Sequence, residues 1–219
     1  MIGVFDSGIG GLCSFERLCE LVKDEELVYL ADRKHAPYGT KTVEEVASRT
    51  RHNVSLLRKI GAERILIACC TASGTYTLLD PDDRAVAIPI IYPAAKAAIS
   101  AAGAYGKITV ISTALTAKAH LFKHELECLD STVQITELEA QSLVELVELG
   151  AKDGDLLPRE SELIDMLCEQ IESGKPNALI LGCTHFSHLK EEFSKRLRGI
   201  NVIDTARLGA EYLAKILKP

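Results

Sequence analysis

Two cysteines follow two similar apolar segments, one in each half of the sequence. Residues 65–68 read Ile-Leu-Ile-Ala and lead into Cys69, and residues 178–182 read Ala-Leu-Ile-Leu-Gly and lead into Cys183. Short apolar runs of this kind are typical of buried parallel strands. Because ligands bind at the carboxyl ends of strands in open α/β sheets, we expect both thiols to face one cleft. Such a pair could take a proton from one face of a carbon atom and return one to the other face.

A glycine-rich turn at residues 6–11, Asp-Ser-Gly-Ile-Gly-Gly, is a second candidate site. It follows an apolar strand and precedes a predicted helix, a context in which backbone N–H groups can bind an anion. Gly8 and Gly10 match the first two glycines of the dinucleotide-binding fingerprint, but Cys13 occupies the third position. A plain tight turn and a nucleotide-binding module therefore both stay open. Asp6 could cap the helix or orient a nearby catalytic group.

Length, composition and charge limit the class of protein. The 219 residues could form one large domain or two small ones. Hydrophobic residues make up 47% and aromatic residues only 5%, which indicates an aliphatic core such as parallel strands provide. The net charge of -6, without a basic block, argues against a nucleic-acid partner. The sequence shows neither a membrane-length apolar run nor a signal peptide, so we expect a cytoplasmic protein that binds no membrane.

The number and spacing of the cysteines point to the same compartment. There are seven, an odd number, and none forms a C-x-x-C pair, so neither a disulfide framework nor a zinc or other metal site is expected. Thiols without this organisation are typical of a reducing cytoplasm. We expect the four cysteines in predicted helices to be buried as small hydrophobes; they are Cys13, Cys19, Cys128 and Cys168.

Strand-length apolar runs alternate with segments of helical period, which predicts parallel sheets. Residues 107–113 resemble residues 1–7 in pattern, so the order of elements restarts in the second half. We therefore predict an α/β fold of two similar domains, with mainly parallel sheets flanked by helices and an active site in the cleft between them. The first domain would contain residues 1–92 and 203–219, and the second residues 93–202.

Local signals set the expected bounds of the elements. Thr42 and Glu45 form a capping box at the start of one predicted helix. The predicted strands are residues 2–6, 28–31, 65–69, 85–92, 107–113, 133–138, 178–183 and 202–203, and the predicted helices are residues 12–22, 43–60, 72–79, 94–102, 116–126, 143–148, 160–172, 189–197 and 206–217.

Five short motifs occur in a fixed order along nearly the whole chain. They are residues 6–11, Asp32 with residues 37–39, residues 69–73, residues 144–150 around Glu148, and residues 182–185. Together they resemble the glutamate racemase branch of the cofactor-independent aspartate/glutamate racemase superfamily. The resemblance implies an amino-acid racemase with no cofactor and no metal, which supplies D-glutamate for peptidoglycan and forms a homodimer.

The resemblance also implies a role for each motif residue. The two catalytic thiols would be Cys69 and Cys183, and the groups that support proton transfer would be Asp6, His185 and Glu148. The substrate contacts would be Asp6, Ser7, Asp32, Tyr38, Gly39, Cys70, Thr71, Thr184 and His185.

Proton transfer without a cofactor requires strong bases. Cys69 and Cys183 each precede a predicted helix, whose positive end would favour the thiolate. Asp6 would assist Cys69, and His185 would assist Cys183. Because the motif loops contain no arginine cluster, the carboxylates of an acidic substrate would be held by hydroxyls and backbone N–H groups.

Cys70 is the main departure from the family pattern, which has asparagine directly after the first cysteine. A thiol is a weak hydrogen-bond donor, and losing one hydrogen bond to a charged group costs roughly 1.5–3 kcal/mol. The loss affects substrate binding without removing either base. Aspartate or another acidic amino acid therefore stays open as the substrate, and so does a non-catalytic amino-acid-binding relative. Phe186, where the family commonly has tyrosine, is a smaller departure.

Overall fold

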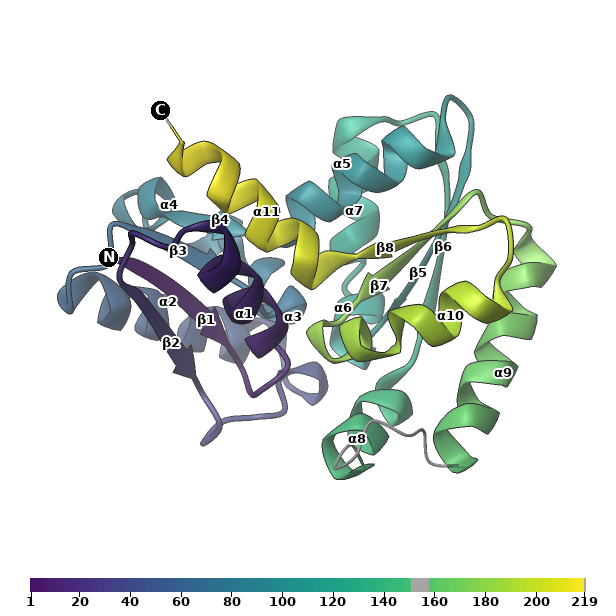
Figure 1. Cartoon of the computed structure of the whole chain (residues 1–219), viewed down its shortest axis with the longest axis horizontal. Coiled ribbons are helices and arrows are strands. Elements are labelled where there is room, and N and C mark those ends of the chain that lie inside the picture. The colour runs from purple at the N-terminus through teal and green to yellow at the C-terminus, as the bar shows by residue number, and fades with distance from the viewer. Residues whose placement is uncertain (151–157, 219) are drawn as a thin grey trace.

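The computed structural model describes residues 1–150 and 158–218, apart from the side chains of residues 148–150. Its strands form two parallel sheets of four strands each, flanked by helices, which confirms the predicted fold class (Figure 1). The strands are β1 (Ile2–Asp6), β2 (Leu27–Ala31), β3 (Arg64–Ile67), β4 (Ala87–Pro89), β5 (Lys107–Ser112), β6 (Gln134–Glu139), β7 (Ala178–Gly182) and β8 (Asn201–Asp204).

Helices connect these strands and cover the sheets (Figure 1). The α-helices are α1 (Leu12–Leu21), α2 (Val43–Lys59), α3 (Cys70–Ser73), α4 (Pro81–Val86), α5 (Ile91–Ala102), α6 (Ala114–Lys118), α7 (Leu121–Leu129), α8 (Gln141–Gly150), α9 (Pro158–Gly174), α10 (Lys190–Arg196) and α11 (Thr205–Leu217). The 3-10 helices are η1 (Tyr38–Thr40), η2 (Tyr76–Leu78) and η3 (Thr184–Leu189). None of the helices in the described ranges is long and apolar enough to span a bilayer.

The two sheets repeat one strand order. The first runs β2-β1-β3-β4 and the second β6-β5-β7-β8. Cys69 comes after β3, which pairs with β1, and Cys183 comes after β7, which pairs with β5. Val4 pairs with Leu66 in one sheet, and Val110 pairs with Ile180 in the other. All four side chains are fully buried, as expected for strands covered on both faces. The restart of the pattern in the sequence thus corresponds to a structural repeat.

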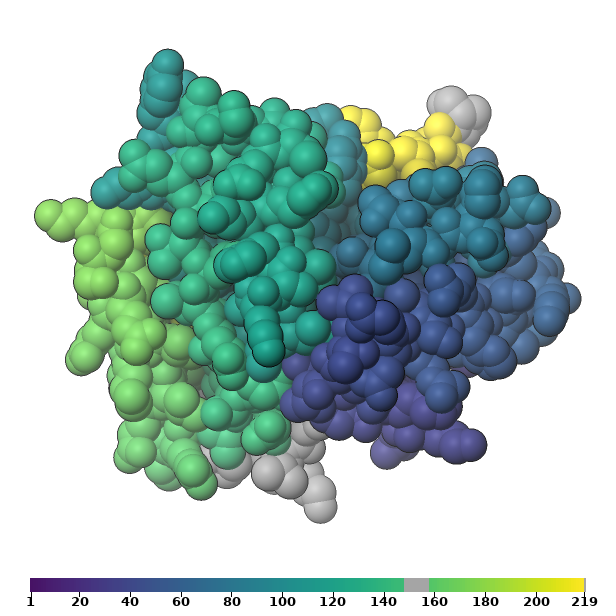
Figure 2. Space-filling model, turned by 180° about the vertical axis from the view of Figure 1, so that it is seen from behind, coloured from purple at the N-terminus to yellow at the C-terminus, as the bar shows by residue number. Residues whose placement is uncertain are grey.

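One hydrophobic cluster joins both halves. It contains Leu66 from the first sheet and Ile180 from the second, with Ala94 of α5 and Leu213 of α11 packed among the same residues. The small side chains along α5 allow close helix packing here. Figure 2, seen from behind, shows the purple-to-blue first half in direct contact with the teal-to-green second half.

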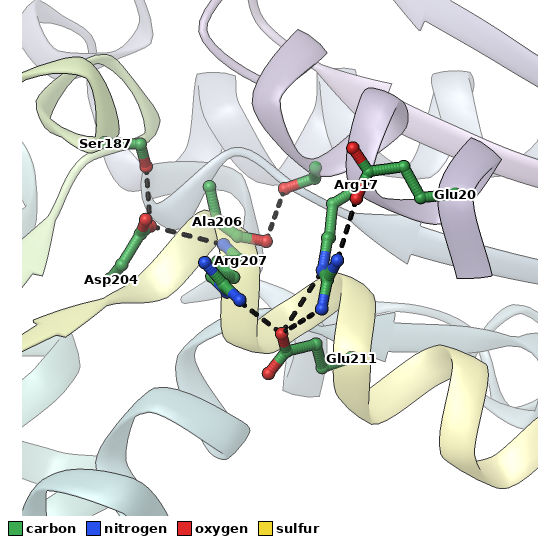
Figure 3. A network of polar contacts seen from close by, with 8 residues as sticks. Arg17, Glu20, Ser187, Asp204, Ala206, Arg207 and Glu211 are labelled. Carbon is green, nitrogen blue, oxygen red and sulfur yellow. Dashed lines mark hydrogen bonds and ion pairs between the residues drawn. The ribbon is translucent and has the colours of Figure 1, made fainter.

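The C-terminal helix α11 leaves the second sheet and packs on α1 of the first half (Figure 3). Glu211 accepts hydrogen bonds from Arg17 of α1 at 2.8 Å and from Arg207 at 3.0 Å. Asp204, at the end of β8, caps α11 by accepting from the Arg207 backbone N–H and also binds Ser187. These contacts fix the position of α11 relative to both halves.

Strand β8 bears on the predicted domain boundary. Ile203 and Asp204 pair with β7 of the second sheet, whereas the predicted first domain resumes at residue 203. The division into two domains stays a prediction. Because β8 pairs with β7, sheet pairing favours a boundary at which the chain returns to the first half only with α11.

Several local predictions differ from the structure. Residues 85–92 contain the end of α4, the short β4 and the start of α5 instead of one strand. Pro81 at the first turn of α4, with Asp82 and Asp83 behind it, favours a helix start there. The helix expected at residues 116–126 is divided, because His120 has a left-handed backbone with φ 53°. The Thr42–Glu45 capping box is confirmed.

The prediction for the helical cysteines was wrong in part. Cys168 is buried, but Cys13 is half-buried and Cys19 and Cys128 are exposed. In α1 the buried positions are Ser14 and Leu18, so the residue after Leu18 points away from the core. Helical period alone does not show which edge of an apolar stripe reaches solvent.

Candidate active site

Cys69 and Cys183 occupy equivalent positions at the carboxyl ends of β3 and β7. Cys69 is the N-cap residue of α3, and Cys183 is the N-cap residue of η3. Each residue is only 6% exposed, and both line one small cavity. Two residues far apart in the sequence, from different sheets, therefore face the same enclosed space.

The cavity lies where loops of both halves meet. It has a volume of about 20 Å³, enough for roughly one water molecule. The predicted site residues that line it are Ser7, Tyr38, Gly39, Cys69, Cys70, Thr71, Cys183, Thr184 and His185. Four further lining residues were not predicted; they are Pro37, Thr113, Gln141 and Val144. The ionisable groups among these thirteen residues are the His185 imidazole, the Tyr38 phenol and the three cysteine thiols.

The surroundings of the Cys69 thiol disfavour its thiolate form. Its sulfur donates a hydrogen bond to Ser7 Oγ over 3.5 Å. Burial and the negative charge of Asp6 raise the pKa of Cys69 to about 11. The backbone N–H groups of Ser7 and of Ala72 in α3 lower the pKa of Cys69, as expected at the start of a helix, but burial and Asp6 outweigh them.

Asp6 lies behind the cavity wall instead of lining it. Its fully buried carboxylate accepts hydrogen bonds from the Gly8 backbone N–H at 2.8 Å and from Thr184 Oγ1 at 3.4 Å. Burial raises the pKa of Asp6 above its usual value, although His185 and these hydrogen bonds oppose the shift. Asp6 thereby links the end of β1 to η3, and its charge acts on the Cys69 thiol.

His185 is the neighbour of the second thiol. Its Nδ1 lies 3.4 Å from Cys183 Sγ. The glycine turn at residues 8–11 packs against this side of the site: a Cβ added at Gly10 would lie 2.5 Å from Thr184 Oγ1 and 2.9 Å from His185 Nδ1. Side chains of η3 therefore occupy the space beside the turn, and this geometry disfavours a phosphate-binding loop.

Asp32 does not line the cavity, and it binds the hydroxyl of Tyr38. The hydroxyl donates to Asp32 Oδ2 at 2.7 Å, and His35 Nδ1 lies 2.7 Å from Asp32 Oδ1. Asn53 donates to Asp32 Oδ2 at 3.3 Å and to the Tyr38 oxygen at 3.2 Å. Although burial opposes it, these hydrogen bonds hold the pKa of Asp32 below its usual value. The group fixes the Pro37–Gly39 segment, and Asn53 was not predicted to take part in it.

Thr113 could have been found from the internal repeat, since it follows β5 as Ser7 follows β1. Its hydroxyl lies 3.0 Å from that of Thr71 and 2.9 Å from that of Thr116. Gln141 follows β6, so its position after a strand was the available signal. Glu148 lies in α8, but its side chain is outside the described part of the chain.

The described residues contain no group of three or more histidine, cysteine, aspartate or glutamate side chains placed to hold a metal ion. The chemistry that the arrangement can perform is proton transfer between sulfur atoms and a small molecule.

The family model described as Asp/Glu/hydantoin racemase matches residues 13–213. The chain belongs to this family. Among its racemase relatives, glutamate racemase of Clostridium botulinum is 36% identical over 208 residues, which cover 93% of this chain and 78% of that protein.

Two solved structures of racemases share the fold. Glutamate racemase isoform RacE1 from Bacillus anthracis has a TM-score of 0.89 and 28% identity, and the match covers 100% of this chain and 81% of that chain. Glutamate racemase from Thermus thermophilus, in complex with β-chloro-D-alanine, has a TM-score of 0.76 and 30% identity, with coverage of 99% and 80%.

Proposed function

We propose that this chain is a cofactor-independent glutamate racemase, an isomerase that interconverts L- and D-glutamate. One observation carries the proposal: Cys69 and Cys183, which follow strands of different sheets, line one buried cavity. The relatives named glutamate racemase support the choice of substrate, and the Thermus thermophilus complex supports an amino-acid ligand.

In the proposed reaction the α-carbon of glutamate lies between the two sulfur atoms. A thiolate on one side takes the α-proton, and the electron pair of the C–H bond stays on the α-carbon and spreads into the α-carboxylate. The thiol on the opposite side then donates its proton to that carbon. The configuration inverts, and the negative charge passes from one sulfur to the other, so atoms and charge balance. The reverse reaction exchanges the two roles.

The buried acid and imidazole groups would exchange protons with the thiols. With a pKa of about 11, Cys69 starts as a proton donor. Before it can act as a base it must lose its proton, and we propose Asp6 as the acceptor because burial makes its carboxylate more basic. His185 would serve Cys183 in the same way, given the 3.4 Å separation. The proposed contribution of Glu148 to proton transfer stays a prediction.

Neutral donors would hold the two carboxylates of the substrate. The hydroxyls of Ser7, Thr71 and Thr184 line the cavity, and no lysine or arginine is among the lining residues. Hydroxyls and oriented backbone N–H groups can bind an anion without formal charge. Because a cavity of about 20 Å³ is too small for an amino acid, we infer that lining side chains or the two halves separate when substrate enters.

The wider setting of the enzyme is part of the proposal. A glutamate racemase supplies D-glutamate for peptidoglycan synthesis. All seven cysteines are free thiols, which supports a reducing, cytoplasmic location. A homodimer and a division into two domains facing the cavity also stay proposals.

Proton exchange tests the function directly. The protein is incubated with L-glutamate in D2O, the α-proton signal is followed by NMR, and the enantiomers are separated. Loss of the α-proton together with D-glutamate formation is the expected result. Exchange with aspartate alone would move the substrate to aspartate. Exchange with neither, together with a melting-temperature shift on adding glutamate, would make the chain an amino-acid-binding relative.

A further inference from the structure

Gln141 is a polar side chain of the cavity wall that the proton-transfer scheme does not use. It is the first residue of α8, directly after β6 and Ala140, and is only 8% exposed. It lines the cavity beside Gly39 and Thr113. Among the lining residues of the described chain it carries the one side-chain amide.

The orientation of the Gln141 amide is fixed by a neighbour. The backbone N–H of Ala114 donates to Gln141 Oε1, with an N···O distance of 3.4 Å. A backbone N–H needs an acceptor, so the amide oxygen must face Ala114 and the amide nitrogen must face the other way. The buried Nε2 group has no hydrogen-bond acceptor among the described residues. It therefore presents two N–H donors that the protein itself does not use.

The other groups that line the cavity indicate which kind of acceptor the Gln141 amide would take. Besides Gln141, the lining side chains are hydroxyls, thiols, one imidazole and apolar groups, and none is a carboxylate. A ligand oxygen with negative charge would satisfy the amide, since charge-assisted hydrogen bonds are the stronger kind. The racemase substrate brings two such groups, its α-carboxylate and its side-chain carboxylate.

A second observation concerns position 70. The family resemblance places an asparagine amide after the first cysteine, whereas this chain has Cys70, a weak donor in the same cavity. The cavity thus has an amide from the second half of the chain and none from the position where the family carries it in the first half.

We propose that Gln141 is a substrate-binding residue whose Nε2 donates a hydrogen bond to a carboxylate of the substrate, in place of the amide absent at position 70. The inference rests on the proposed racemase function and adds a residue to it. Gln141 also touches the first half, because a Cβ added at Gly39 would lie 2.5 Å from its Oε1. Gln141 therefore lies where the two halves meet.

The substitution Q141E tests the donor role at almost constant shape. A carboxylate keeps an acceptor for the Ala114 N–H but replaces the N–H donors by a repelling oxygen. We expect the KM for glutamate to rise about 10- to 100-fold, with a smaller change in kcat. The matched control is Q134E, the same change at an exposed residue of β6, which should leave KM unchanged. A Q141E enzyme with KM within twofold of the wild type overturns the inference.

A second variant covers the case in which Q141E does not fold. Q141M removes donor and acceptor without adding charge, and its KM should also rise at least about tenfold. Competitive inhibition then identifies the carboxylate: L-2-aminobutyrate lacks the side-chain carboxylate, and 4-aminobutyrate lacks the α-carboxylate. The inhibitor that weakens in Q141M retains the group that Gln141 binds, and weakening of neither contradicts the inference. The D2O exchange assay on the wild-type protein tests the proposed function separately. If the wild type exchanges no α-proton of glutamate, the proposed function itself is wrong.

Discussion

Replacement of Tyr38 by phenylalanine tests whether the Tyr38 hydroxyl holds the cavity wall or binds substrate. The hydroxyl donates to Asp32 over 2.7 Å and accepts from Asn53 over 3.2 Å, and the residue is 1% exposed. Y38F removes only this oxygen, since the ring can keep its contact with Phe5 at 6.3 Å between centroids. The Asp32 carboxylate would lose one of its donors and Asn53 one of its acceptors.

The expected cost follows from these contacts. A hydrogen bond to a charged group contributes about 1.5–3 kcal/mol. Asp32 keeps His35 and Asn53 as partners in the variant, so we expect a loss of about 1.5–2 kcal/mol in the free energy of unfolding. Urea denaturation at pH 7 measures this difference. Because the hydroxyl is bound to Asp32 and Asn53, neither of which lines the cavity, kcat/KM per folded molecule should change less than about fivefold.

The loss of stability should depend on pH in one direction. Burial opposes the shift, but hydrogen bonds hold the folded-state pKa of Asp32 below its ordinary value of 3.8. A lowered carboxyl pKa contributes stability above the unfolded value, and this is lost as pH falls through the folded value. The difference between wild type and Y38F should therefore be complete at pH 7 and shrink below about pH 4. A tenfold rise in the KM for glutamate with unchanged stability would refute this reasoning.

Three further predictions follow from the site. C69S and C183S should each lower kcat at least about 100-fold in both directions, measured by D2O exchange, and a fully active single variant removes that thiol from the mechanism. G10A should destabilise the fold by about 1–3 kcal/mol in urea, because its Cβ would lie 2.5 Å from a threonine hydroxyl, whereas the control G8A, with 4.0 Å to the nearest atom, should stay within about 0.5 kcal/mol. Iodoacetamide at pH 8 should modify exposed Cys19 before Cys69, whose thiolate fraction is about 0.1% at a pKa of about 11; equal rates by mass spectrometry would contradict the burial argument.

The sequence alone determined the class of fold and the two thiols. Apolar runs that alternate with helical segments predict parallel sheets. Because ligands bind at the carboxyl ends of such strands, Cys69 and Cys183 were each expected at the binding edge of a sheet. The capping box at Thr42, a signal of short range, was also confirmed, whereas the strand expected at residues 85–92 and the single helix expected at residues 116–126 were not. The confirmed inferences depend on residues close together in the chain or on a repeated pattern.

The tertiary structure decided what each side chain of the site contacts. Asn53 joins Asp32 and Tyr38, and Gln141 enters the cavity wall from the other half. Spacing offered no signal for Asn53, and for Gln141 it indicated only a position after a strand. The balance of effects on the Cys69 thiol was likewise not predictable, since burial and Asp6 outweigh the backbone N–H groups at the start of the short helix that follows. Hydrogen bonds, close approach and desolvation act through space between residues far apart in sequence, so only the folded chain fixes them.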